Sequence, residues 1–223
     1  MEGVSEELRD ELRLLRDRLG RLEDQQAVRA LQFKYGYYLD KCLFDDIVEL
    51  FAEDATLYFL NGIFHGKAGA RRLLYGGVTG FDGPVNGMMF EHIMAQDIVD
   101  VAPDRTRAWG RFRCFLQGGV HESKTDAPAH IPDQFWEAGI YENEYSKRAG
   151  VWRIQVLNYR VVYQANYEQG WAHSPRTPLV IANYKDVYPR SPRGPDELRP
   201  APAAWPETFV MPFHYAHPVT GKR

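Results

Sequence analysis

The chain has 223 residues, 44% of them hydrophobic, and its formal net charge is -3. This length indicates one domain with appendages, and the lack of a basic balance argues against nucleic-acid binding. No apolar run approaches the ~20 residues that span a membrane, and residues 1–20 lack the apolar core of a signal peptide. The two cysteines, Cys42 and Cys114, are too few for a disulfide framework and indicate a cytoplasmic protein.

The N-terminal segment predicts a charged amphipathic helix. Its leucines recur at alternating spacings of four and three residues, the pattern of one helix face: Leu8, Leu12, Leu15, Leu19 and Leu22. About two heptads are too few for an independent coiled coil. The helix therefore either lies as an arm on its own domain or grips a neighbouring subunit, and Gly20 is expected to break it.

Helical patterns and one hairpin pattern follow. Two further helices, a β-hairpin and a short helix are expected at residues 23–41, 44–51, 56–65 and 67–74. The hairpin prediction depends on Asn61-Gly62, because Asn-Gly between apolar runs favours a tight turn. The Gly-rich segment 75–87 lacks both glycine motifs that bind phosphate, so it is expected to be a mobile lid or a plain connection.

The second half is rich in strand patterns and ends in a proline-rich tail. Long strands are expected at residues 88–101, 105–117, 136–146 and 151–163. Ten of the fourteen prolines fall between Pro175 and Pro218, which excludes a regular sheet or a long helix there. The many aromatic residues of this tail are atypical of disorder, so it is expected to wrap over the domain or a partner subunit.

Helices followed by a long antiparallel sheet predict an α+β fold, with the helices on one face of a curved sheet. The concave side of that sheet is either filled by a helix or left as a pocket for a small, largely apolar molecule. The predicted parts are a helical arm at 1–22, an α+β barrel at 23–169 and an extension at 170–223.

Tyr35 and Asp40 form the first candidate pair for chemistry. Asp40 ends the second predicted helix, in a segment rich in aromatic residues. A carboxyl group near apolar walls loses hydration, which raises its pKa and suits it to proton transfer. The alternative is an ordinary helix-end aspartate in water, or a cap for the next helix.

His92 is the second candidate. Strand alternation places it on one face with Met88, Phe90 and Met94. It is either a core histidine with satisfied hydrogen bonds or, if this face lines the pocket, a partner for Asp40. In that case the carboxylate would orient the imidazole and stabilise its protonated form.

The last long strand supplies a third candidate. Its alternation places Asn158 and Arg160 on the face that begins with Trp152 and Ile154. Because a buried unpaired charge is costly, this change of character indicates a polar patch inside the pocket, with Arg160 holding an anionic or phenolic oxygen. The alternative is that the strand has passed beyond the core and Arg160 is solvated.

Aromatic residues supply candidate substrate contacts: Tyr58, Phe112, Trp136 and Tyr141. The sequence contains neither a nucleophile elbow of the G-x-S-x-G type nor a histidine or cysteine spacing typical of a metal site. Asp, His, Tyr and Arg around an aromatic cavity therefore predict acid–base chemistry without a metal or a cofactor.

The motifs resemble a known group of proteins. Residues 23–40 read E-D-x-x-A-V-R-x-L-x-x-x-Y-x-x-x-L-D, and L-F-A-E-D-A follows at 50–55. Together with G-K-A-G-A at 66–70 and G-V-W-R-I at 150–154, they resemble the SnoaL-like branch of the nuclear transport factor 2-like superfamily. The resemblance covers about residues 23–163. It implies a cone-shaped α+β barrel that assembles into dimers or trimers.

Two cofactor-free lyases of this superfamily, scytalone dehydratase and bile-acid 7α-dehydratase, are similar at the candidate positions. The similarity implies that Asp40 and His92 form a catalytic pair, assisted by Tyr35 and, late in the chain, by Arg160. It also implies a homotrimer. Two positions depart from the scytalone enzyme, which has a histidine and an asparagine in place of Leu116 and Tyr141.

The resemblance predicts a cofactor-free lyase that dehydrates a small hydroxylated aromatic compound. The long arm and the aromatic tail also resemble bacterial enzymes that remove water and formaldehyde from lignin-derived diaryl compounds. Two alternatives stay open: a module that binds a small molecule or builds an oligomer without catalysis, and an isomerase or cyclase that uses the same residues on a polycyclic substrate.

Overall fold

The computed structural model describes residues 5–78, 83–127, 131–174 and 184–222. Its helices are α1 (Glu6–Asp40), α2 (Phe44–Glu49), α3 (Gly66–Leu73), the π-helix η1 (Leu74–Val78) and α4 (Gly170–His173). Its strands are β1 (Phe51–Phe59), β2 (Gly62–His65), β3 (Met88–Val101), β4 (Arg107–Val120), β5 (Gln134–Arg148), β6 (Val151–Asn166) and β7 (Glu197–Leu198). This order confirms the predicted α+β class.

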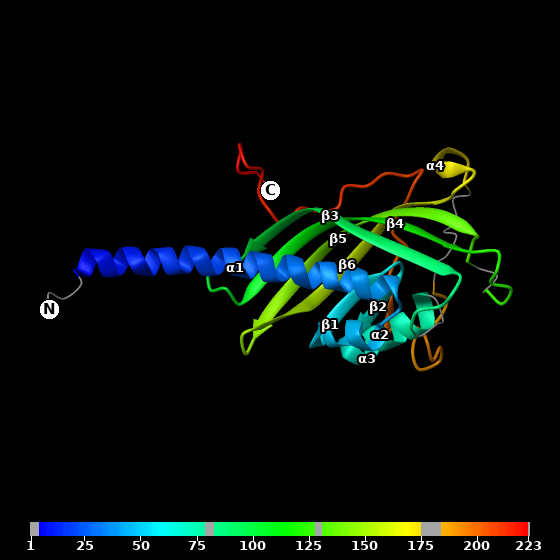
Figure 1. The fold of residues 1–223 in the computed structure, drawn as a ribbon, viewed down its shortest axis with the longest axis horizontal. Coiled ribbons are helices and arrows are strands. Elements are labelled where there is room, and N and C mark those ends of the chain that lie inside the picture. The colour runs from blue at the N-terminus through cyan, green and yellow to red at the C-terminus, as the bar shows by residue number, and fades with distance from the viewer. Residues whose placement is uncertain (1–4, 79–82, 128–130, 175–183, 223) are drawn as a thin grey trace.

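The strands form one curved sheet in the order β3-β4-β5-β6-β1-β2-β7. β1 runs parallel to β6, and the other neighbours are antiparallel. Figure 1 shows the sheet curving around α1, with α2 and α3 gathered beside β1 and β2. No helix in the described ranges is long and apolar enough to cross a membrane.

The core fills the space between the helices and the concave side of the sheet. Its largest fully buried apolar side chains come from α2 and four strands: Phe44, Phe51, Leu57, Phe64, Phe112 and Ile154. Burial of each such side chain stabilises the fold by about 1.5–3 kcal/mol relative to exposure. This packing fixes the walls between which the candidate site lies.

One continuous helix replaces the two that were expected. α1 begins where the Ser5 hydroxyl accepts a hydrogen bond from the Leu8 N–H at 3.3 Å, and it continues to Asp40. The prediction that Gly20 breaks the helix is wrong. A Cβ at Gly20 would lie 1.9 Å from a guanidinium nitrogen of Arg105, so glycine here leaves room for a neighbouring side chain. The predicted domain boundary at residue 22 falls inside α1.

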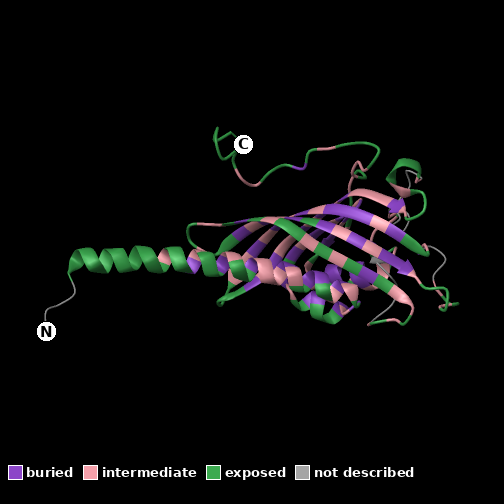
Figure 2. Cartoon of the chain, turned by 45° about the horizontal axis from the view of Figure 1, so that its top comes forward, coloured by how far each residue is buried: buried purple, intermediate pink, exposed green. Residues whose placement is uncertain are grey.

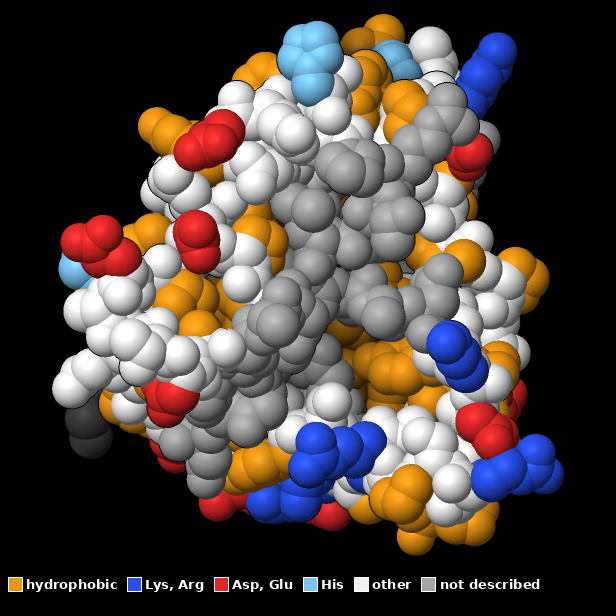
Figure 3. Space-filling model, turned by 90° about the vertical axis from the view of Figure 1, so that its right-hand side faces the viewer, with side chains coloured by type: hydrophobic (Ala, Val, Ile, Leu, Met, Phe, Trp, Pro, Cys, Tyr) orange, Lys and Arg blue, Asp and Glu red, His pale blue; other side chains and the backbone are white. Residues whose placement is uncertain are grey.

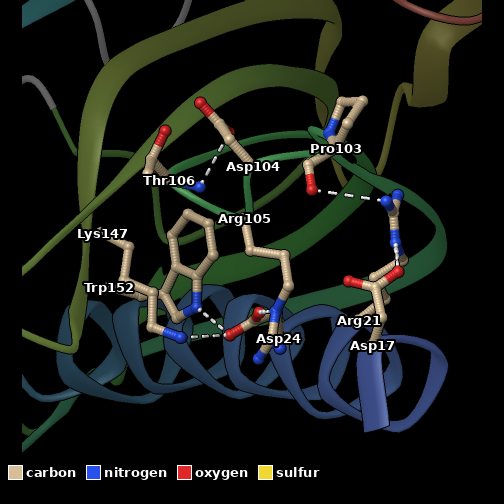
Figure 4. Close-up of polar contacts among 9 residues, drawn as sticks. All are labelled: Asp17, Arg21, Asp24, Pro103, Asp104, Arg105, Thr106, Lys147 and Trp152. Carbon is tan, nitrogen blue, oxygen red and sulfur yellow. Dashed lines mark hydrogen bonds and ion pairs between the residues drawn. The ribbon is translucent and has the colours of Figure 1, made fainter. Parts of the chain in front are cut away.

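Asp24 fixes α1 to the sheet, as Figure 4 shows. Its side chain is 5% exposed, and Arg105 and Lys147 each donate to it at 2.6 Å. The indole N–H of Trp152 donates at 2.9 Å. Burial acts to raise the pKa of Asp24, but the hydrogen bonds from Lys147 and Arg105 outweigh it and the pKa is lowered. The charged cluster therefore holds α1 at a fixed place on the sheet.

The N-terminal half of α1 projects beyond the sheet as a free arm (Figures 1 and 2). Its leucines between Leu8 and Leu22 are 41% to 63% exposed. The expectation that the arm lies on its own domain is therefore wrong.

The described part of the C-terminal extension packs on its own domain, which is one of the two positions expected for it. The Trp205 N–H donates to the Val162 carbonyl at 2.7 Å, and the Asp196 N–H donates to the Ile63 carbonyl at 2.8 Å. Of the predicted lid 75–87, residues 79–82 lie outside the described residues. So do residues 175–183 of the extension.

Candidate active site

A cavity opens between the end of α1, α3, η1 and the strands of the curved sheet. Its walls are mostly apolar: Leu39, Phe59, Leu73, Leu74, Phe90, Leu116 and Phe135. Figure 3 views the end of the molecule opposite the arm, where hydrophobic side chains show in a recess of the surface.

His92 lies at one wall of this cavity and is in contact with Asp40. Asp40 is the last residue of α1, and its Oδ1 accepts a hydrogen bond from Nδ1 of His92 at 2.8 Å. The same oxygen accepts the backbone N–H of His92 at 2.7 Å. The side chains are 7% and 12% exposed, and His92 lines the cavity. Because the carboxylate accepts from Nδ1, the neutral imidazole has Nε2 free as a base.

Gly36 lets β3 approach α1 closely enough for this contact. A Cβ at Gly36 would lie 3.3 Å from the His92 carbonyl oxygen and 3.2 Å from the Met94 side chain. Both distances are shorter than ordinary carbon contacts, so a larger residue would push the strand away from the helix. The pairing of Asp40 with His92 thus depends on a glycine one turn before Asp40.

Tyr35 and Tyr141 lie beside the pair as two buried phenols that line the cavity. Their ring centroids are 5.9 Å apart at an interplanar angle of 81°. Burial raises the pKa of both phenols well above the ordinary value. Both therefore stay protonated and can donate a hydrogen bond to a ligand oxygen.

Glu137 also lines the cavity, and the sequence-based predictions missed it. It is 3% exposed, with the Tyr159 hydroxyl donating to Oε1 at 2.5 Å and the Gln164 amide donating to Oε2. Burial raises the pKa of Glu137, although both hydrogen bonds act to lower it. Strand alternation gave a signal, because Glu137 shares its face of β5 with Tyr141, which was selected as a substrate contact.

The side chains of β6 lie on other faces of the sheet than predicted, because the strand contains two bulges. Glu144 pairs with Val156 while Tyr145 pairs with Ile154, so Gln155 is an extra residue on β6. A second register shift follows between Ala138 and Gly139 of β5. Since each bulge shifts the alternation by one residue, the sequence pattern cannot be extended along the whole strand.

Arg160 and Asn158 consequently lie on the outer face of β6, away from the cavity. Tyr159, between them, lines the cavity. The Arg160 guanidinium lies over the ring of Phe209 at 4.0 Å, in the C-terminal extension. The expectation that Asn158 and Arg160 share a face with Trp152 inside the pocket is wrong, because a bulge separates them.

The other predicted substrate contacts separate into three groups. Tyr141 lines the cavity. Phe112 is fully buried in the core and packs edge-on against Phe33 at 6.2 Å. Tyr58 and Trp136 lie on the outer face: Arg199 covers the ring of Tyr58, and Trp136 stacks on Tyr167. Both alternate with cavity residues, Phe59 on β1 and Glu137 on β5.

The arrangement provides a free base and three candidate acids around one apolar space. His92 can take a proton through Nε2, while Glu137 and the two phenols can donate one. Within the described ranges, no group of three or more His, Cys, Asp or Glu side chains is placed to hold a metal ion.

The comparisons with known proteins agree with this architecture. A model of the SnoaL-like domain matches residues 20–158. No curated protein matches the chain.

Solved structures with the same fold are similar over about two thirds of the chain or more. A candidate scytalone dehydratase from Novosphingobium aromaticivorans has a TM-score of 0.52 and 19% identity, over 66% of this chain and 89% of that one. A type 2 hexachlorocyclohexane dehydrochlorinase, LinA, has the same TM-score and identity, over 77% of this chain and 97% of that one. LinA-type3 from Novosphingobium barchaimii has a TM-score of 0.51 and 21% identity over 66% and 92%. Identities this low are evidence for the fold alone.

Proposed function

Because the chain belongs to the SnoaL-like family, we propose that it is a cofactor-independent lyase that removes water from a small hydroxylated aromatic compound. One observation carries the proposal: the hydrogen-bonded Asp40–His92 pair meets an apolar cavity that also contains Glu137. Elimination of water needs a base for a C–H proton and an acid for the leaving hydroxyl. Both kinds of group face the same space.

The proposed reaction begins with a substrate ring held among the apolar walls. Nε2 of His92 takes a proton from the carbon next to the carbinol, and Asp40 stabilises the imidazolium that forms. As the C–H bond breaks, its electron pair forms a carbon–carbon double bond and the C–O bond breaks. The leaving oxygen takes a proton from a neutral acid and departs as water.

Glu137 is the favoured acid in this scheme, because burial raises the pKa of its carboxyl group and so favours the protonated form. After one turnover His92 holds an extra proton and Glu137 has lost one, so a proton returned from His92 to Glu137 restores the starting state. Tyr35 and Tyr141 donate hydrogen bonds to a substrate phenol or carbonyl oxygen. A positioned acid or base typically contributes about 10²–10⁴-fold in rate.

The lining of the cavity indicates the substrate class. Its walls are mostly apolar and also carry Tyr35, Tyr141 and Glu137, which suits an aromatic ring with hydroxyl groups. A phenolic alcohol is therefore the first choice. The names of two similar structures, a dehydratase and a dehydrochlorinase, describe eliminations and agree with this choice. A homotrimer remains a prediction.

The experiment is a panel of phenolic alcohols and diaryl compounds, with ultraviolet detection of new conjugation. The proposal expects absorbance from a new double bond with at least one phenolic alcohol of the panel. With that substrate, Asp40→Asn and His92→Ala should each lower kcat/KM by about 100-fold or more, whereas the outer-face control Arg160→Gln should keep it. Residual activity within about threefold in both cavity variants would exclude the proposal. An isomer without new conjugation would favour the isomerase alternative.

A further inference from the structure

We propose that the N-terminal arm, residues 6–22 of α1, pairs in parallel with the arm of a second copy of this chain. Two heptads are too few for an isolated coiled coil, but the arm continues a helix that the barrel already anchors, so the cost of helix nucleation is already met. The arm carries five leucines at the a and d positions of a heptad pattern: Leu8, Leu12, Leu15, Leu19 and Leu22. None of them is buried, and they are 41% to 63% exposed. A helix face of this composition buries its leucines against another helix.

The leucine face points away from the domain that carries it. With about 100° per residue, the five leucines centre about 160° around the helix from Val28, which packs into the core. Two arms that meet along this face therefore place their barrels on opposite outer sides of the pair. The barrels do not compete for the space in which the helices meet.

The arm is held rigidly enough to present this face. Buried Asp24 ties the helix to the sheet through three contacts (Figure 4). Its partners are Arg105 in the turn before β4, Lys147 of β5 and Trp152 of β6. Arg21 adds a hydrogen bond to the Pro103 carbonyl at 3.3 Å. The helix therefore leaves the barrel in one direction, which lowers the entropic cost of pairing.

The charges beside the leucines select a parallel partner. In a parallel pair, each g position faces the e position five residues further along the partner. Glu11 then faces the partner's Arg16, and Arg18 faces the partner's Glu23. None of these four side chains forms a salt bridge within the described part of the chain. They are free for contacts between copies.

An antiparallel pair is less complementary. When all five leucines overlap in that orientation, Glu11 faces the partner's Arg18, but Arg16 comes next to the partner's Arg16. The parallel pair has no such contact between like charges, which disfavour pairing. The mixed signs along the arm also differ from the basic face of a helix that lies on an anionic membrane.

The test is the oligomeric state of the full chain by analytical ultracentrifugation. Leu15→Asp with Leu19→Asp should weaken self-association by at least about tenfold in dissociation constant. Leu14→Asp is the matched control, because Leu14 is 59% exposed but lies off the leucine face. Its association should match that of the wild type. Loss of association in both variants, or in neither, would overturn the proposal.

Charge reversal tests the orientation and does not depend on the leucines. Glu11→Arg and Arg16→Glu should each weaken association, and the double variant should restore it. A Leu15→Cys variant should form a disulfide between copies, whereas Leu14→Cys should not, and both natural cysteines are buried. Absence of both charge rescue and cross-linking, or binding of the wild-type arm to phosphatidylserine vesicles as a monomer, would contradict pairing between copies.

Discussion

Replacement of Glu137 by Gln should change how the stability of the protein depends on pH. Glu137 is 3% exposed, and burial raises the pKa of its carboxyl group above that of the unfolded chain. For an acid with a raised pKa in the folded state, the stability is fully present below the unfolded pKa. It is lost as the pH rises through the folded pKa. Wild-type protein should therefore lose stability between about pH 4.3, the ordinary pKa of Glu, and the folded pKa.

The size of this loss follows from linkage. Each pH unit between the two pKa values costs the wild type about 1.36 kcal/mol of unfolding free energy. Gln has the shape of a protonated Glu and no charge. It still accepts the hydrogen bond from the Tyr159 hydroxyl through its carbonyl oxygen, but its amide meets the Gln164 amide. Near pH 4, the Glu137→Gln variant should thus have an unfolding free energy about 1 kcal/mol below that of the wild type. As the pH rises, the wild type loses stability, and the variant should become as stable as the wild type or more stable.

The assay is urea unfolding of both proteins from pH 4 to pH 8, monitored by circular dichroism and tryptophan fluorescence. The informative quantity is the difference in unfolding free energy between wild type and variant, because other titrating groups cancel in it. A difference that does not change with pH would refute the argument. It would mean that Glu137 has the same pKa in the folded and unfolded chain.

Two further predictions concern residues outside the cavity. Asp24→Asn should lower the unfolding free energy by about 1–3 kcal/mol at neutral pH, because Arg105 and Lys147, which are 30% and 24% exposed, lose the carboxylate that accepts their hydrogen bonds. The pKa of Asp24 is lowered in the folded protein. Its contribution to the unfolding free energy is therefore present above the unfolded pKa of about 3.9 and is lost as the pH falls through the folded pKa. A variant as stable as the wild type in urea would contradict this prediction. Arg160→Gln should leave kcat/KM within about threefold on any substrate, and a loss of 100-fold or more would return Arg160 to the site.

The sequence was sufficient to predict the elements whose signal is local. The Asn61-Gly62 hairpin and the four long strands are present, with ends that differ by a few residues. Met88, Phe90 and His92 alternate on an uninterrupted part of β3, so the facing of His92 was predictable. The pairing of His92 with Asp40 was one of two alternatives until the resemblance favoured it, because no local pattern brings the end of α1 to β3.

The remaining features depend on contacts between distant residues. A bulge at Gln155 reverses the facing of Arg160, and bulges have no reliable signature in one strand alone. Gly20 was expected to break the helix because glycine disfavours helix interiors. Its actual role, leaving room for Arg105, depends on a residue 85 positions further along the chain. Glu137 was missed because a charged residue in a strand is ordinarily exposed, and only the three-dimensional cavity shows that it is buried.

The protonation of the His92 ring tests the central claim most directly, because it needs no substrate. Nitrogen-15 chemical shifts of the histidine side chains, assigned with His92→Gln, report which ring nitrogen carries the proton in the neutral form. The account predicts a protonated Nδ1 that donates to Asp40 and an unprotonated Nε2 that faces the cavity, with this preference weakened in Asp40→Asn. A neutral ring protonated at Nε2, unchanged by Asp40→Asn, would contradict the assignment of His92 as the base.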